Sequence, residues 1–371
     1  MVAQYTYLAT DLVTNTILGE LPVNNVSLTC QLNQAGNMQA GGHLDDPRIT
    51  NDDFLACTTP GRTAFWAYRE DQIVWGGMIL SRQYNSDGKA LTLTGQTFEA
   101  YATRRFPRYT IGLTTLSWNY LTTQTIDQLW SQLQGVPGGS IGVQHMNGYP
   151  ANDVATALTI NGYDLATSYD DIIQSIVGLS NGPDYTIGWS QDSSGNPSKQ
   201  LICGLPIGNP VGMTDLVVDY PGPVMDYLYN ENASSGNNVW WATGDGDAAS
   251  QTQGQAVDQN SLNSGYPVFE GVNNYSGVTD QPTINAHAAS DLANFPIPLI
   301  THNVDLKGDV FPEFGSYGMG DYVVVNVTDP RFSAGFTFNV RAIGWTIQPP
   351  DEGQGTEKIT LALDEASASG Q

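Results

Sequence analysis

The four histidines of this 371-residue chain are the first side chains to consider for catalysis or metal binding. They are His43, His145, His287 and His302. A catalytic zinc site needs clustered ligands and a general base, and no His-x-His or His-Glu-x-x-His pattern occurs. Two weaker arrangements exist: His287 lies four residues before Asp291, and His43 lies beside Asp45 and Asp46. A polar helix face and a polar loop explain these better, so we expect no metal ion and no cofactor.

Two segments match the Gly-x-Ser-x-Gly pattern of a serine nucleophile, Gly138–Gly142 and Gly178–Gly182. In a nucleophile elbow the serine follows a strand and opens a helix. Both segments instead come just after, or at the end of, a predicted helix, and a chain with 40 glycines produces such matches by chance. No cysteine stands in a local signature of a nucleophile.

Acidic residues form adjacent pairs at Asp45–Asp46, Asp52–Asp53 and Asp170–Asp171. A glycosidase needs two carboxylates about 5 to 10 Å apart across a cleft, contributed by separate parts of the fold. Adjacent aspartates do not meet that need. The segment Gly244–Asp247 hints at calcium but lacks the full Asp-x-Asp-x-Asp-Gly order and the later Glu. No catalytic residue is therefore assigned, and the chain is predicted not to be an enzyme.

The net charge of −24 is spread unevenly along the chain. Between Tyr109 and Leu306 the one basic residue is Lys199, against 18 Asp and Glu. Phosphates are neutralised by Lys and Arg, so neither a nucleic-acid groove nor an anionic membrane is an expected partner. An acidic surface suits a wall past which DNA slides without binding. The alternative is that acidity only keeps the protein in solution.

Three cysteines, Cys30, Cys57 and Cys203, are too few and too scattered for a disulfide framework, so we expect free thiols. The first residues lack the basic start and apolar run of a signal peptide. The longest strongly apolar stretch, Ile73–Leu80, is too short to span a bilayer. We expect a protein that folds in the cytoplasm and leaves the cell only with a particle.

Alternating patterns predict β-structure at both ends of the chain. Near the N-terminus the predicted strands are Thr63–Arg69, Gln72–Tyr84 and Ala90–Thr94, with Ser86, Asp87 and Gly88 forming a hairpin turn. The glycine pair Gly76–Gly77 inside the long strand indicates a bulge of the kind seen in small barrels. Near the C-terminus the predicted strands are Tyr322–Thr328, Gly335–Ile347 and Lys358–Leu363.

Helical patterns predict three helices in the middle of the chain. Thr122–Gly135 places Ile126, Leu129, Trp130 and Leu133 on one face. A second helix begins at Ser168, whose spacing to Asp171 fits a capping box. A third, shorter helix covers Ile284–Phe295.

The two β regions follow a similar plan. Ile73–Ile79 followed by Leu91–Leu93 resembles Val340–Ile347 followed by Ile359–Leu361, because each pairs a long strand bearing Gly and Trp with a short alternating strand. We interpret this as a weak internal duplication. The alternative is two unrelated meanders.

Several segments resemble the tail hub family, which comprises minor tail proteins of long non-contractile-tailed phages, especially those of actinobacterial hosts. The segments are Arg62–Gly95, Val218–Asn232, Val239–Gly244, Met319–Val325 and Val340–Leu363. The resemblance implies a homotrimeric ring in which each chain contributes two similar barrel-like domains. Such a ring joins the sixfold tail tube and distal tail ring to the threefold tip and lines the DNA exit channel. The implied location is the tail tip of the virion, after assembly in the host cytoplasm.

The resemblance also implies partners and a domain plan. The partners are further copies of the chain, the distal tail protein ring, the tape measure protein and tail-tip or fibre proteins, with transient passage of DNA and no membrane. The expected fold is mainly β with α+β insertions. Its parts are a first hub β-barrel domain at 1–108, an α/β lateral domain at 109–204, connecting segments at 205–306 with a helix near 284–295, and a second hub β-barrel domain at 307–371. No lysin or receptor-binding domain is expected after the last strand.

Large side chains and the only basic cluster are the candidates for subunit contacts. Trp240 and Trp241 are adjacent, so on a strand they face opposite sides and one should be exposed. The remaining candidates are Trp75, Arg104, Arg105 and Arg108. For the basic cluster the alternative is a solvated turn.

Two other functions compete with the structural one. The abundance of Trp and Tyr and the scarcity of Lys would also fit an extracellular glycan-active or glycan-binding β-protein. A tail-associated peptidoglycan hydrolase would need a catalytic constellation that the sequence does not contain.

Overall fold

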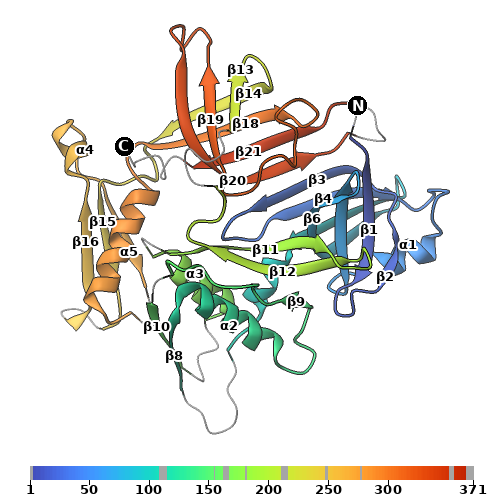
Figure 1. Cartoon of the computed structure of the whole chain (residues 1–371), viewed down its shortest axis with the longest axis horizontal. Helices are drawn as coiled ribbons and strands as arrows, with labels where there is room; N and C mark the ends of the chain where they lie inside the picture. The colour runs from blue at the N-terminus through green and yellow to red at the C-terminus, as the bar shows by residue number, and fades with distance from the viewer. Residues whose placement is uncertain are drawn as a thin grey trace.

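The computed structural model describes residues 3–107, 115–153, 155–161, 167–179, 182–209, 216–246, 250–275, 278–350 and 355–364. Strands form most of the regular structure, and the longer helices lie in two segments inserted between and within the β regions (Figure 1). The chain is therefore mainly β with helical insertions, as the sequence predicts. Among the helices of the described residues, none is long and apolar enough to cross a membrane.

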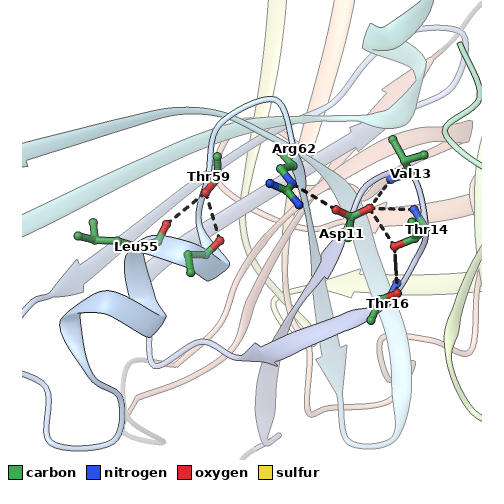
Figure 2. Close-up of polar contacts among 8 residues, drawn as sticks. Asp11, Val13, Thr14, Thr16, Leu55, Thr59 and Arg62 are labelled. Atoms are coloured by element: carbon green, nitrogen blue, oxygen red, sulfur yellow. Dashed lines mark hydrogen bonds and ion pairs between the residues drawn. The ribbon is translucent and has the colours of Figure 1, made fainter. Parts of the chain in front are cut away.

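The N-terminal module consists of strands and short helices before residue 105. They are β1 (Tyr5–Asp11), β2 (Ile17–Glu20), β3 (Asn24–Gln31), β4 (Asn37–His43), α1 (Asn51–Cys57), β5 (Thr63–Arg69), β6 (Gln72–Asn85), β7 (Ala90–Thr97) and the 3-10 helix η1 (Phe98–Arg104). The turn from β1 to β2 is built on one carboxylate: Asp11 accepts from the N–H groups of Val13 and Thr14 and pairs with Arg62 (Figure 2). The backbone bond from Thr14 is the main reason that the pKa of Asp11 lies below its ordinary value.

The lateral domain follows the N-terminal module. It contains β8 (Thr115–Leu121), α2 (Thr122–Gln134), β9 (Val143–Gln144), β10 (Ala155–Asn161), α3 (Tyr169–Val177), β11 (Asp184–Gln191) and β12 (Pro197–Gly204). Its strands form two small sheets, β8 with β10 and β9 with β11 and β12.

The C-terminal module is assembled from both sides of an inserted unit. Its strands are β13 (Leu216–Tyr220), β14 (Val224–Asn232), β18 (Leu299–Lys307), β19 (Tyr322–Val327), β20 (Phe336–Gln348) and β21 (Lys358–Asp364). The inserted unit lies between β14 and β18 and contains β15 (Val239–Thr243), β16 (Gln253–Val257), α4 (Gln259–Asn263), β17 (Glu270–Asn274) and α5 (Gln281–Asn294). The connecting segment 205–306 thus supplies β13, β14 and most of β18.

The two modules share one continuous 13-stranded sheet. Its order is β14-β18-β21-β20-β3-β4-β7-β6-β5-β1-β2, with β19 pairing β20 and β13 pairing β19. The connection between the modules is the antiparallel pairing of β3 with β20, which lie side by side at the centre of Figure 1.

All three predicted helices are present, and side-chain capping explains where α3 and α5 begin. In α2 the predicted apolar face is buried. In α3 the capping box is complete: the Ser168 side chain accepts from the Asp171 N–H, and the Asp171 carboxylate accepts from the Ser168 N–H. Helix α5 begins at Gln281, three residues before the predicted start, because Asp280 caps it by accepting from the Thr283 N–H.

Among the described residues, buried side chains form two large cores and one small one. The first core contains side chains from both modules, including Leu28, Trp75 and Ile347. The second lies between the N-terminal module and the lateral domain, where Trp66 and Phe98 join the apolar faces of α2 and α3. Trp189 packs against both large cores, and α5 packs on the inserted sheet in the third. The modules and the lateral domain are therefore packed as one body.

Candidate assembly surface

The internal duplication is visible as equal strand order and equal register. The path β3-β4-β7-β6-β5 in the N-terminal module corresponds to β14-β18-β21-β20-β19 in the C-terminal module. The pairing of β6 with β5 ends at Met78, and the pairing of β20 with β19 ends at Arg341. A register shift follows at once in both, between Ile79 and Ser81 and between Ala342 and Gly344. From there the two antiparallel hairpins keep the same register to their ends, so this part of the two modules matches residue by residue.

This register corrects part of the sequence alignment. Leu91–Leu93 and Ile359–Leu361 do occupy equivalent places, opposite Tyr84–Arg82 and Ile347–Trp345. The sequence comparison, however, matches the Gly- and Trp-bearing parts of β6 and β20 out of register. In the structure the residue of β20 equivalent to Trp75 is Phe338. Trp75 lies before the shared bulge and Trp345 lies after it, so the two tryptophans are not equivalent. A second bulge in β6, at Val74, has no counterpart in β20.

A buried ion pair fixes the two modules to each other. Arg69, at the end of β5, donates to both oxygens of Glu357 at 2.9 and 3.0 Å, and to the carbonyls of Gly308 and Phe314. Glu357 also accepts from the Tyr5 hydroxyl, and its side chain is 1% exposed. Burial and the neighbouring carboxylate raise the pKa of Tyr5 far above its ordinary value. Three segments of the chain are thus tied together by charge-assisted bonds.

A second buried arginine ties the lateral domain to the C-terminal module. Arg341 on β20 pairs with Asp184 at the start of β11, and it also donates to the carbonyls of Ile207 and Gly320. The lateral domain is therefore held to both modules by polar contacts as well as by the shared core.

The one basic residue between 109 and 306 is buried rather than on the surface. The ammonium group of Lys199 donates to the carbonyls of Leu12 and Ile141 at 2.9 and 2.7 Å and lies 4.8 Å from the ring centre of Phe98. Burial lowers the pKa of Lys199 to about 8. The surface of this long segment consequently carries carboxylates without lysine or arginine.

The tryptophan candidates have different environments. Trp75 is 0% exposed and donates to the Thr29 carbonyl at 2.9 Å, so its indole offers no surface to another subunit in this conformation. Trp240 is buried against α5, and the adjacent Trp241 is partly exposed on the opposite face of β15, with its N–H on Glu270. The expected division between a core and an outward tryptophan is therefore present. On this outward face Val272 stands opposite Trp241 and Val257 stands opposite Val239, and both valines are exposed.

The basic cluster is not a free patch. Arg105 donates to the Leu133 carbonyl at 2.8 Å and lies over the Tyr101 ring, so it belongs to the contact between η1 and α2. Arg104 is exposed at the end of η1. Arg108 lies outside the described residues.

The histidines are placed in separate surroundings. His145 pairs with Asp127 at 3.0 Å, while His302 stacks on Phe338. His287 stacks on Tyr275, whose hydroxyl donates to Asp291, so tyrosine is the partner of that carboxylate. Within the described part of the chain, no three or more His, Cys, Asp or Glu side chains gather closely enough to hold a metal ion.

The remaining polar motifs have local partners or fall partly outside the described residues. Asp45 pairs with Lys89, Asp46 pairs with Arg48, and Asp53 accepts from Thr50 at the start of α1. Two motifs include residues outside the described ranges: the second Gly-x-Ser-x-Gly match, and the acidic loop ending at Asp247. All three cysteines are buried with free thiols.

Comparison with known proteins gives no match to a family model and none to a curated protein. Solved structures do match over nearly the whole chain. The 43 kDa tail protein of prophage MuSo2 from Shewanella oneidensis gives a TM-score of 0.58 at 10% identity, covering 98% of this chain and 99% of that one. A tail protein from Neisseria meningitidis MC58 gives 0.56 at 12% identity, covering 97% of each chain.

A third structure, prophage tail protein gp18 from Listeria monocytogenes EGD-e, gives a TM-score of 0.51 at 10% identity and covers 97% of this chain and 95% of that one. This chain shares its fold with phage tail proteins. Because the match covers nearly all of both chains, the shared fold includes the two modules as well as the lateral domain and the inserted unit.

Proposed function

We propose that this chain is a structural tail hub protein of a phage virion. Three copies form a ring that joins the sixfold tail tube and distal tail ring to the threefold tail tip. The observation that carries the proposal is the module repeated in register, within a fold shared with phage tail proteins. The assignment to phages of actinobacterial hosts rests on the sequence resemblance alone.

The repeat gives the proposed ring its symmetry. Two like modules in each of three chains provide six nearly equivalent positions around one axis. A sixfold tube can dock on those positions, while the lateral domain and the inserted unit keep threefold identity for the tip. Closed cyclic symmetry requires contacts between different faces of each copy. The Arg69–Glu357 pair supports such a ring because it holds the two modules of one chain at a fixed angle.

An acidic channel is the second part of the proposal. DNA that passes a negative wall releases no counterions by touching it and so does not bind. The net charge of −24 and the burial of Lys199 favour this arrangement. The partners proposed along the channel are the distal tail ring, the tape measure protein and tail-tip or fibre proteins, with the complete ring in the virion after assembly in the host cytoplasm.

The proposed role includes no enzymatic activity. The support is that His145, Asp291 and Asp46, from the candidate motifs, each have a separate structural partner. Purified protein should leave host cell wall intact in a zymogram. A clearing zone would favour the hydrolase instead, and selective binding on a glycan array would favour a glycan-binding protein.

Light scattering and negative-stain images of the purified chain test the ring. We expect a mass of three copies and a ring with six lobes around a channel. Reconstruction of an intact tail tip should then place three copies in it. Six copies per tip, or a channel lined mainly by Arg and Lys, would contradict the proposal.

A further inference from the structure

The small sheet of the inserted unit has one covered face and one outward face. Helix α5 packs against the covered face, where Ala242, Ile284 and Ala288 form the third core (Figure 1). Trp240 is buried on the same side, and a side-chain carbon on Gly271 would come within 2.6 Å of its ring. The chain itself therefore fills the covered face, and the outward face is left to solvent.

The strand register places nine residues on the outward face, in three rows of three. Strand β15 lies in the centre, with β16 antiparallel on one side and β17 parallel on the other. Trp241 is the middle residue of the middle strand, so it has neighbours on all sides. The rows are Val257↔Val239↔Glu270, Gln255↔Trp241↔Val272 and Gln253↔Thr243↔Asn274.

An aromatic ring and a carboxylate stand side by side on this face. The indole N–H of Trp241 donates to Oε1 of Glu270 at 3.0 Å, which holds the ring beside the carboxylate. Trp241 is partly exposed and Glu270 is exposed. The face of an indole ring attracts a cation through its quadrupole, and a carboxylate pairs with the same cation. A lysine or arginine side chain placed here gains from both attractions at once.

The same combination of ring and carboxylate binds an arginine at two places within this chain. The guanidinium of Arg331 lies 4.8 Å from the ring centre of Tyr229, with the carboxylate of Glu231 at 3.7 Å. Arg69 pairs with Glu357 and lies 6.0 Å from the centre of a phenylalanine ring. The outward face of the inserted unit provides the ring and the carboxylate without the cation.

The cation that would complete this arrangement is missing from the described part of the chain. Residues 200–306 contain no lysine and no arginine, so the inserted unit has no such cation of its own. The ion pairs among the described residues all involve carboxylates other than Glu270. The net charge of −24 also attracts positively charged partners over a longer range. Charge complementarity therefore favours a basic occupant.

The size of the outward face favours a short segment over a whole protein surface. A standard protein interface takes about 20 to 30 residues a side, and this face has nine. Val257 and Val272 are 42% and 65% exposed on it, so apolar side chains of the occupant gain by covering them. The exposed amides of Gln253 and Gln255 form a polar border on one side.

We propose that the outward face of the inserted unit binds a basic segment of another protein. An arginine of that segment lies over the Trp241 ring and pairs with the second oxygen of Glu270, while apolar side chains next to it cover Val257 and Val272. Arginine is favoured over lysine because its guanidinium is planar, stacks on rings and is more weakly hydrated. This binding goes beyond the proposed hub role and does not depend on the number of copies in a ring.

Titration of the full-length chain with a labelled peptide tests this binding. The probe is a fluorescent octapeptide in which valine and arginine alternate. In the control peptide every arginine is replaced by citrulline, which keeps the planar end group and removes the charge. We expect the arginine peptide to bind and the citrulline peptide to bind roughly tenfold or more weakly. Equal affinities for the two peptides, or no binding of the arginine peptide, would overturn the proposal.

Matched variants locate the peptide on the chain, because an acidic protein attracts arginine peptides to other surfaces as well. Trp241→Ala and Glu270→Gln should each weaken binding of the arginine peptide about five- to tenfold. Tyr84→Ala and Glu20→Gln remove an exposed ring and an exposed carboxylate elsewhere and should leave the affinity unchanged. Glu270→Gln is a conservative change at an exposed position, so it keeps the test valid if Trp241→Ala unfolds. Equal weakening by Glu20→Gln and Glu270→Gln would contradict binding at this face.

Two further results would assign the face to a different occupant and so refute the proposal. One is quenching of tryptophan fluorescence by cellohexaose that disappears in Trp241→Ala, with no peptide binding, which would identify a sugar-binding face. The other is weaker self-association of Trp241→Ala and Glu270→Gln with no peptide binding, which would identify a second copy of the chain. Light scattering of the same proteins separates this inference from the hub role. A ring without peptide binding refutes the inference alone, and peptide binding without a ring refutes the ring alone.

Discussion

At the scale of single residues, the strongest polar interactions lie where distant segments meet. Glu357 is bound by Arg69 and Tyr5, which lie in the N-terminal module, hundreds of residues earlier in the chain. A buried ion pair of this kind adds little net stability over an apolar pair, but loss of one partner leaves a buried charge without compensation. The two arginine clusters therefore act mainly to fix relative orientation.

Arg69→Met should destabilise the protein by about 3 to 5 kcal/mol, because Glu357 would remain buried without its cation. Urea unfolding followed by tryptophan fluorescence measures this loss. The control is Arg48→Met, which breaks an exposed pair with Asp46 and should change the free energy of unfolding by about 0 to 1 kcal/mol. Similar losses in the two variants would show that the buried pair does not hold the modules together.

The buried carboxyl group of Glu99 makes the stability of the fold depend on pH. Its carboxylate is buried and accepts from the Ile187 N–H and the Thr186 hydroxyl, and burial raises the pKa of Glu99 above its ordinary value. The folded state therefore holds the proton more tightly than the unfolded chain. The stability from Glu99 is complete below about pH 4.3 and is lost as the pH rises through the folded pKa.

Glu99→Gln removes this titration and should keep the Ile187 bond. The difference in melting temperature, variant minus wild type, should thus increase as the pH is raised from 4 toward neutrality. Glu20→Gln removes a carboxylate at an exposed position and serves as the control. A difference that shrinks with rising pH would mean that the folded state stabilises the charged carboxylate.

At the scale of elements, the helix boundaries are determined by residues close in sequence, whereas the strand bulges are determined by the partner strands. Helix α3 begins where its capping box lies, and α2 ends at Gln134, with Gly135 as its C-cap before Pro137. The bulges of β6 and β20, by contrast, sit where each long strand passes from one partner strand to the next. In β20 the first half pairs with β19, and the second half pairs with β21 on one side and with β3 on the other.

Ser168→Ala should destabilise the protein by about 1 kcal/mol, because the Asp171 N–H loses its acceptor at the start of α3. Thermal unfolding monitored by circular dichroism measures the change. Ser131→Ala in the last turn of α2 is the control and should stay within about 0.5 kcal/mol of wild type. An unchanged melting temperature for Ser168→Ala would show that packing alone fixes the start of this helix.

At the scale of the whole molecule, the packing predicts joint unfolding of the modules and the lateral domain. Cys30 lies in the first large core and Cys203 in the second, and Trp189 packs against both. The Arg341–Asp184 pair also crosses between these parts. Separate unfolding would break this pair and expose the apolar surface that the two cores share.

Alkylation of the two thiols at increasing urea concentration tests this coupling. Cys30 and Cys203 should become reactive with the same midpoint, and all three cysteines should react without reductant once the chain is unfolded. Reaction of Cys203 at clearly lower urea would show that the lateral domain unfolds alone. A Cys30–Cys57 crosslink would contradict the expectation of free thiols.

The sequence by itself determined the local elements of this protein. The predicted strand Thr63–Arg69 is found as β5, and the predicted helix Thr122–Gly135 is found as α2, one residue shorter, because alternation and helical periodicity act over a few residues. The mainly β class follows from the same patterns. The sequence also indicated that the β region is duplicated, since Leu91–Leu93 and Ile359–Leu361 do occupy equivalent positions.

Only the tertiary structure decided which strand edges meet, as β3 and β20 do. The buried arginines could not be found from the sequence, because Arg69 and Glu357 are 288 residues apart and neither stands in a recognisable pattern. Trp75 looked like a contact residue from its size, yet it is buried in the core. Burial, ion pairing and edge pairing depend on distances between segments far apart in the chain, and local periodicity carries no information about those distances.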